Sequence, residues 1–216
     1  MLVLTFSTGV VDAVGYLGLD RVFTANMTGN VVILGMALTG AESLPVAGPA
    51  AALVAFFVGA LVGGRVLRGA PAGWSVRATA ALLALAIVIA GAAVAALVCA
   101  TSPALELGVT IAVSFSMGAQ AGVARHLGVA DVTTVVVTST LVGLAYDSRL
   151  GRGSSQKWVR RLLAVVAIGA GAVVGALLVR LGLAPGMLLC AAIVAAVAVA
   201  GHLGRAAGVG SAEAAT

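Results

Sequence analysis

Long apolar runs occupy almost the whole chain, and they constrain its fold more than any other feature of the sequence. Eight such runs, separated by short links, lie at 2–19, 22–38, 46–67, 78–100, 105–124, 132–145, 162–179 and 187–203. An α-helix needs about 20 apolar residues to span the hydrocarbon core of a bilayer. The third, fourth and fifth runs meet that length comfortably, and the seventh and eighth adequately. The sequence therefore predicts an all-α fold, a polytopic transmembrane helical bundle.

The composition excludes a soluble globular protein. Of the 216 residues, 62% are hydrophobic and 9% are charged, whereas about 25% are charged in a typical soluble domain. The net charge of +5 raises the question of nucleic-acid binding. Loops of membrane proteins are rich in Lys and Arg for topological reasons alone, so we expect no nucleic-acid partner and take the lipid bilayer as the surroundings of the chain.

The first two runs carry polar residues where a spanning helix should be apolar. Asp12 lies at the centre of the first run, and intramembrane carboxylates usually face a cavity or a partner. The second run opens with Phe-Thr-Ala-Asn-Met-Thr-Gly-Asn, and polar groups at this depth must be packed in protein or line a cavity. The candidates for substrate or ion contact are Asp12, Thr24, Asn26, Thr28 and Asn30. For Asp12, the alternatives are structural pairing or a first helix that lies partly outside the bilayer. For the other four residues, the alternative is interhelical hydrogen bonding.

Two parts of the chain resemble each other at a spacing of 110 residues. Shifting the sequence by that distance places 16–34 over 126–144, where seven of 19 positions are identical. The matches pair Thr24 with Thr134 and Thr28 with Thr138, so the two later threonines become binding candidates as well. Gln120 precedes the second copy and could contribute to the same cavity, although polar side chains in membrane helices often bond to a neighbouring helix instead.

Basic residues predict how the two copies are oriented. They gather in the link between the third and fourth runs and in the link between the sixth and seventh, at Arg65, Arg68, Arg77, Arg149, Arg152, Lys157, Arg160 and Arg161. The positive-inside rule places both links in the cytoplasm. Eight full crossings would put them on opposite sides, whereas counting runs one and two as one crossing, and five and six as one, puts them on the same side. We therefore predict six net crossings in two inverted halves of three.

Inverted halves that each contain a broken helix are a common plan among transporters, in which the broken segments meet near the midplane. The segments 23–30 and 133–140 are the ones we nominate as broken. The chain is then one transmembrane domain, 1–203, with repeats at about 1–100 and 104–203, followed by a disordered tail at 204–216.

Other motifs carry less specific information. The patterns Gly59-x-x-x-Gly63 and Gly171-x-x-x-Gly175 let helices approach closely, either inside one protomer or across a homodimer interface. Neither cysteine has a CxxC or His partner, and no catalytic or phosphate-binding motif is present. We expect no cofactor, no metal site and no enzymatic activity.

One family resemblance is specific. The order Gly9-Val-Val-Asp-Ala-Val-Gly-Tyr-Leu-Gly-Leu, followed by Phe-Thr-Ala-Asn-Met-Thr-Gly-Asn at 23–30, resembles the YoaK-type family of small bacterial integral membrane proteins. The resemblance covers nearly the whole chain. The later run Thr133-Thr-Val-Val-Val-Thr is similar to the family's second motif, although Ser139 stands where that motif has glycine. The resemblance implies a transmembrane protein, at most a transporter, without an assigned substrate.

The function that the sequence favours is transport or facilitated passage of a small solute or ion, in the cytoplasmic membrane of a bacterium and with the basic loops facing the cytoplasm. The alternative is a non-transporting scaffold or accessory subunit whose polar motif serves helix packing. Substrate, coupling ion and oligomeric state do not follow from the sequence.

Overall fold

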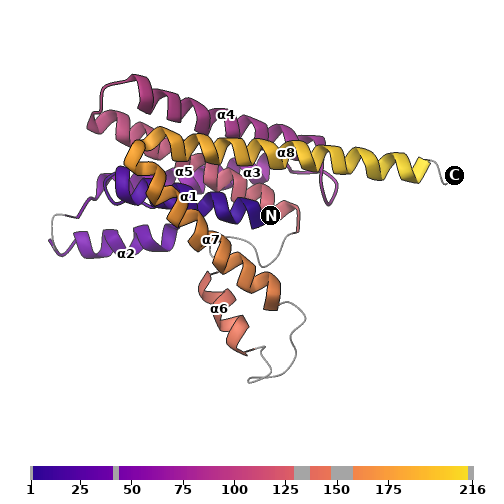
Figure 1. Ribbon diagram of the computed structural model, residues 1–216, viewed down its shortest axis with the longest axis horizontal. Helices are drawn as coiled ribbons and strands as arrows, with labels where there is room; N and C mark the ends of the chain where they lie inside the picture. The colour runs from indigo at the N-terminus through magenta and orange to yellow at the C-terminus, as the bar shows by residue number, and fades with distance from the viewer. Residues whose placement is uncertain (1, 41–43, 129–136, 147–157, 214–216) are drawn as a thin grey trace.

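The computed structural model describes residues 2–40, 44–128, 137–146 and 158–213, and side chains as far as residue 206 (Figure 1). The described residues form helices joined by short links and contain no strand, so the all-α prediction is confirmed. The elements are α1 (Leu2–Gly18), α2 (Met27–Ala37), α3 (Ala47–Val66), α4 (Val76–Val98), α5 (Pro103–His126), α6 (Val137–Tyr146), α7 (Trp158–Leu178), the 3₁₀ turn η2 (Val179–Leu181) and α8 (Leu183–Glu213).

Five of these helices, α3, α4, α5, α7 and α8, are long and apolar enough to cross a membrane. The remaining helices, α1, α2 and α6, are apolar but shorter. Large apolar side chains point outward on the long helices, including Phe57 at 65% exposure and Ile87 at 71%. Contiguous apolar surface of this kind is rare on soluble proteins and suits a lipid environment. The structure thus agrees with a multi-pass membrane protein.

Local sequence explains where two of the long helices begin. The Ser75 hydroxyl accepts a hydrogen bond from the Ala78 backbone N–H at 3.1 Å, which satisfies one free donor in the first turn of α4. The Ser102 hydroxyl does the same for the Leu105 N–H at 3.2 Å, and Pro103 follows it at a position where a helix needs no N–H donor. Helix α8 continues to Glu213, so the tail predicted to be disordered overlaps a helical stretch.

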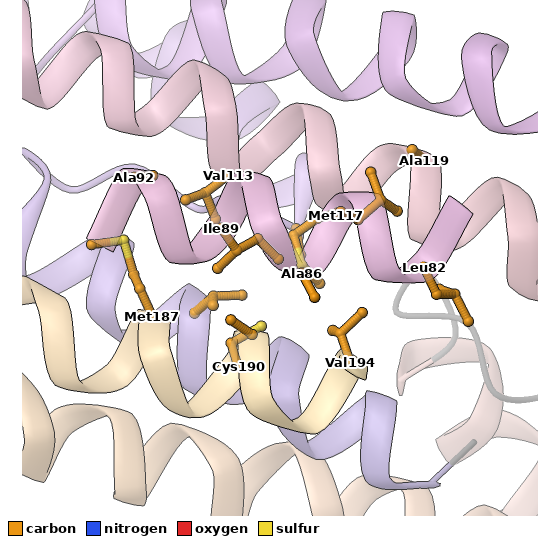
Figure 2. Packing of buried hydrophobic residues seen from close by; sticks show 14 of the residues in the cluster. Leu82, Ala86, Ile89, Ala92, Val113, Met117, Ala119, Met187, Cys190 and Val194 are labelled. Atoms are coloured by element: carbon orange, nitrogen blue, oxygen red, sulfur yellow. The ribbon is translucent and has the colours of Figure 1, made fainter. Parts of the chain in front are cut away.

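The apolar core lies where α4, α5 and α8 meet, with α1 packed along its side. Figure 2 shows Ile89 of α4 and Met117 of α5 near Cys190 of α8. Cys190 is a fully buried free cysteine and packs in this core as a small apolar side chain. This core holds together helices from both predicted halves of the chain.

Glycines bring the first helix of each half against the third helix of the other. A Cβ atom added at Gly59 in α3 would collide with the backbone carbonyl of Phe115 in α5. A Cβ atom added at Gly171 in α7 would collide in the same way with the carbonyl of Phe6 in α1. Of the two alternatives raised by the GxxxG patterns, close contact inside the protomer is therefore the one observed. The short helices follow the same arrangement, since α2 packs on α3 and α6 packs on α7.

The described helix ends lie at two opposite ends of the molecule. At one end of the molecule, Gly18 at the close of α1 lies against Val179 and Leu183, where α7 passes into α8. At the other end, the ring Nε2 of His126, the last residue of α5, lies 3.2 Å from the carbonyl oxygen of Pro71 in the link between α3 and α4. Gly201, in the second half of α8, packs against the Trp74 ring of the same link. The chain therefore runs back and forth between these two ends.

Candidate functional site

The residues between α1 and α2 form a partly buried, non-helical segment that turns back along α1; we call residues 19–26 the returning segment. The turn uses left-handed backbone at Asp20 and Arg21, with φ values of 54° and 58°. The segment then runs so close to α1 that a Cβ atom on Gly15 would lie 2.5 Å from the Val22 carbonyl oxygen. Glycine is required at this position because any side chain would push the segment away.

Asp12 fixes the returning segment. Its Oδ1 atom accepts hydrogen bonds from the backbone N–H groups of Ala25 at 2.7 Å and Asn26 at 3.2 Å, and its side chain is buried. Non-helical backbone inside a membrane protein needs such partners because no water is present to supply them. Asp12 lies six residues before the end of α1, so the segment reaches back about 9 Å along the helix, at 1.5 Å per residue. Helix α2 thus begins at the level of the middle of α1.

Asn30 fixes the same segment from the other side. Its Oδ1 accepts a hydrogen bond from the Phe23 N–H at 2.9 Å, and its Nδ2 donates one to the Phe23 carbonyl oxygen at 2.6 Å. The side chain is fully buried. These two hydrogen bonds hold the Phe23 backbone in place between α1 and α2. Asn30, like Asp12, therefore stabilises the fold of the returning segment. For Asp12, the sequence left structural pairing as an alternative to substrate or ion contact. The structure shows such pairing, between the carboxyl group and the backbone N–H groups of Ala25 and Asn26.

A pocket of about 430 Å³ lies beside the start of α2 and is lined by α1, α2, α6, α7 and the end of the returning segment. This volume falls within the range of about 300–1,000 Å³ that is common for ligand sites. The polar lining comes from Asn26, Thr28 and Thr138, and Gly29 lies among them. Tyr16 adds an aromatic ring that carries a hydroxyl, and the apolar lining comes from Phe23, Val32, Ile33, Val137 and Ile168. The rings of Tyr16 and Phe23 stack with their centroids 4.9 Å apart, which gives the pocket one aromatic wall.

Three polar side chains of the pocket, those of Asn26, Thr28 and Thr138, have unused hydrogen-bonding capacity. Asn26 occupies the N-cap position of α2, yet its side chain makes no capping hydrogen bond. Within the described part of the chain, neither it nor the hydroxyls of Thr28 and Thr138 has a side-chain hydrogen bond to another residue. All three side chains are exposed. An amide and two hydroxyls offer both donors and acceptors to a bound molecule.

The remaining sequence candidates lie elsewhere. Thr24 is fully buried in the returning segment, and Gln120 is 5% exposed in α5; neither lines the pocket. In the described residues, Thr24 Oγ1 and Gln120 Oε1 lack hydrogen-bond partners. Thr134 lies outside the described residues. Of the eight candidates, then, Asn26, Thr28 and Thr138 come together, whereas Asp12 and Asn30 anchor backbone.

Sequence reasoning missed the apolar and aromatic walls of the pocket. Phe23 opens the polar motif, and Tyr16 lies one helical turn beyond Asp12, so an aromatic pair near the motif could have been anticipated. Ile168 gives no such signal, because it is one of many aliphatic residues in α7 and only packing brings it to the pocket. In the described residues, His, Cys, Asp and Glu form no group of three that could hold a metal ion.

Comparison with known proteins places the chain among membrane proteins without an assigned activity. No solved structure matches it. Over 182 residues it is 35% identical to the UPF0700 transmembrane protein YoaK of Bacillus subtilis (strain 168), an alignment that covers 81% of this chain and 80% of that relative. Residues 1–200 match the family described as "Protein of unknown function (DUF1275)". The protein is therefore a member of the DUF1275 family, as its YoaK-like motif indicated.

Proposed function

We propose that this protein transports, or facilitates the passage of, a small solute or ion across the cytoplasmic membrane, and that the pocket between α1, α2, α6 and α7 is its binding site. The observation that carries this proposal is the meeting of two polar segments from opposite halves of the chain. Thr28 and Thr138 are 110 residues apart in the sequence, yet both line one pocket, and neither hydroxyl has a hydrogen-bond partner among the described residues. Side chains that served packing alone would be expected to bond to each other or to backbone.

The path of the chain supports six net crossings in two inverted halves. In this reading α1 crosses, the returning segment and α2 form a re-entrant hairpin at the same end, and α3 and α4 cross in turn (Figure 1). Helices α5, α7 and α8 repeat the order in the opposite sense, with α6 as the second short helix. Both basic links would then face the cytoplasm. Two broken segments that enter from opposite sides and meet near mid-depth are the arrangement used by many transporters.

The scaffold alternative also has a specific observation in its favour. Asp12 and Asn30, two of the polar residues that mark the motif, bond to backbone of their own chain. A motif that only folds a hairpin would be expected to look like this. The two functions predict different roles for Asn26, whose side chain makes no capping hydrogen bond to α2 and has no other partner within the described residues.

A flux measurement separates the two functions. Purified protein would be reconstituted into vesicles of phosphatidylcholine and phosphatidylglycerol, and permeability to small solutes and ions would be compared with protein-free vesicles. We expect permeability to rise for at least one solute, and Asn26→Ala to remove most of that rise while its thermal unfolding temperature in detergent stays unchanged. Thr39→Val, an exposed change outside the pocket, is the matched control. No flux from the folded protein, together with lower stability of Asn26→Ala, would indicate the scaffold.

A further inference from the structure

The lining of the pocket restricts the charge of its ligand. Among the described residues that line it, none is Asp, Glu, Lys, Arg or His. A charged ligand that leaves water for an apolar site needs an opposite charge or a dense set of dipoles to replace its hydration. The lining residues that the structure describes offer one carboxamide and the hydroxyls of two threonines and Tyr16 among apolar side chains, and these neutral groups do not supply that replacement.

Among the described residues, Asp12 brings a carboxyl group close to the pocket, because it accepts a hydrogen bond from the backbone of the lining residue Asn26, and this group is already engaged. Asp12 directs Oδ1 to the Ala25 and Asn26 N–H groups, is buried, and is not part of the lining. A cation in the pocket would therefore lack direct contact with this group.

The same carboxyl group also weakens the attraction of the pocket for anions. The N-terminus of a helix carries a partial positive charge that favours anions. Helix α2 begins at Met27 next to the pocket, but the Asp12 carboxyl bonds to the backbone of the two residues that precede it. An acidic group of the protein thus lies beside the positive end of α2, and it disfavours a second negative charge at this point.

We infer that the pocket takes an uncharged small molecule that carries hydroxyl or amide groups. The free amide of Asn26 and the hydroxyls of Thr28 and Thr138 each offer a donor and an acceptor, which matches such groups on a solute. The stacked Tyr16 and Phe23 rings and the aliphatic wall of Ile33 and Ile168 suit the carbon skeleton of the solute. This assignment rests on the proposed transport function and names the class of solute for the same pocket.

The test uses the full chain in vesicles and two sets of probes. Urea, acetamide, glycerol and erythritol are the neutral probes, followed by light scattering after an osmotic step. Potassium, chloride and acetate are the charged probes, followed with a potential-sensitive dye and an internal pH indicator. We expect the protein to raise permeability to one or more neutral probes and to leave ion permeability at the level of protein-free vesicles.

Variants of Thr28 tie the result to the pocket. Thr28→Val keeps the shape of the side chain but removes its hydroxyl, and we expect it to lower neutral-solute permeability about fivefold, as the loss of a hydrogen bond worth about 1 kcal/mol would. Thr28→Ser keeps the hydroxyl and should retain most of the permeability. Thr39→Val should behave as the unmodified protein, and equal unfolding temperatures would show that all variants are folded.

The possible outcomes are distinct. Ion flux that depends on Thr28, without neutral-solute flux, would overturn the assignment of solute class and leave the transport function standing. Neutral-solute flux that Thr28→Val does not change would overturn the assignment of this pocket. Absence of flux for both sets of probes, with folded protein, would contradict the transport function and the solute class with it.

Discussion

The polar residues of the motif divide by what their side chains contact. Asp12 and Asn30 are buried and bond to the backbone of the returning segment, whereas Asn26, Thr28 and Thr138 face a pocket and are free within the described structure. A buried backbone group without a partner costs about 1–3 kcal/mol, so the first kind of residue should control folding. The second kind should control binding.

Asn30→Leu should destabilise the protein without any direct effect on the pocket. The change leaves the Phe23 N–H and carbonyl oxygen without their side-chain partners, since both bond to the Asn30 carboxamide. We expect the free energy of unfolding to fall by about 2 kcal/mol or more. Unfolding in mixed micelles, followed by Trp fluorescence, would measure the change. Stability equal to that of the unmodified protein would show that the Phe23 backbone finds other partners.

Asp12→Asn and Asp12→Leu should differ. The asparagine retains an oxygen that can accept from the Ala25 N–H, so we expect a folded protein whose flux of a neutral solute is reduced by less than about twofold. The leucine has no acceptor and leaves two N–H groups unpaired, so unfolding should occur at clearly lower temperature. Full loss of flux in a stable Asp12→Asn protein would instead indicate that the carboxyl couples transport to an ion.

At the scale of elements, the close pairs are α3 with α5 and α7 with α1, and glycine makes both possible. In each pair the backbone carbonyl of a phenylalanine, Phe115 or Phe6, lies where a glycine Cβ would be. Backbones that approach this closely gain van der Waals contact, which drives helix association in membranes, where lipid is as apolar as the side chains. These contacts join the two halves of the chain.

Single Gly→Ala changes test this packing with controls on the same helices. Gly59→Ala and Gly171→Ala each place a methyl group against a backbone carbonyl, and we expect each to lower stability by about 1–3 kcal/mol. Gly64→Ala and Gly169→Ala face open space and should be neutral or slightly stabilising, because alanine favours helix. The comparison is made by thermal unfolding in detergent. Equal effects at packed and open positions would contradict the close contact between halves.

At the scale of the whole molecule, α1 packs on α7 and α5 packs on α3, and the described links between helices lie at two ends of the molecule. The link that contains Trp74 lies at the same end as His126 and Gly201, whereas Gly18 lies with Val179 at the other end. Five helices are long and apolar enough to cross the membrane. If α1 crosses as well, the hairpin of the returning segment and α2 lies on one side of the membrane and the basic links lie on the other. The predicted orientation can therefore be measured directly.

Cysteine labelling should distinguish six net crossings from eight. In a background with Cys99 and Cys190 replaced by alanine, Gly73→Cys and Ser154→Cys should react with an impermeant thiol reagent from the same side of the membrane. Thr39→Cys, in the link after α2, should react from the opposite side. Reaction of the cysteines at 73 and 154 from opposite sides would contradict the six-crossing topology. Ser154 lies outside the described residues and serves only as a reporter of sidedness.

The sequence by itself determined the helical membrane fold, the family and the presence of an unusual polar segment. These properties depend on local composition: uninterrupted apolar runs produce spanning helices, and Thr, Asn and Gly interrupt one of them. The spacing of 110 residues also related Thr28 to Thr138 without any knowledge of their positions in space. It could not assign their roles, because the same residue types serve binding and folding.

Only the tertiary structure decided which polar residues bond to the protein and which remain free. Asp12 and Asn26 looked equivalent as candidates, yet the path of residues 19–26 back along α1 turns the carboxyl toward backbone and leaves the amide in a pocket. Long-range packing also brought Ile168 to that pocket, whereas Gln120 is not among the residues that line it. The physical reason is that hydrogen-bond satisfaction depends on the three-dimensional neighbours of each group, and those neighbours come from distant parts of the chain.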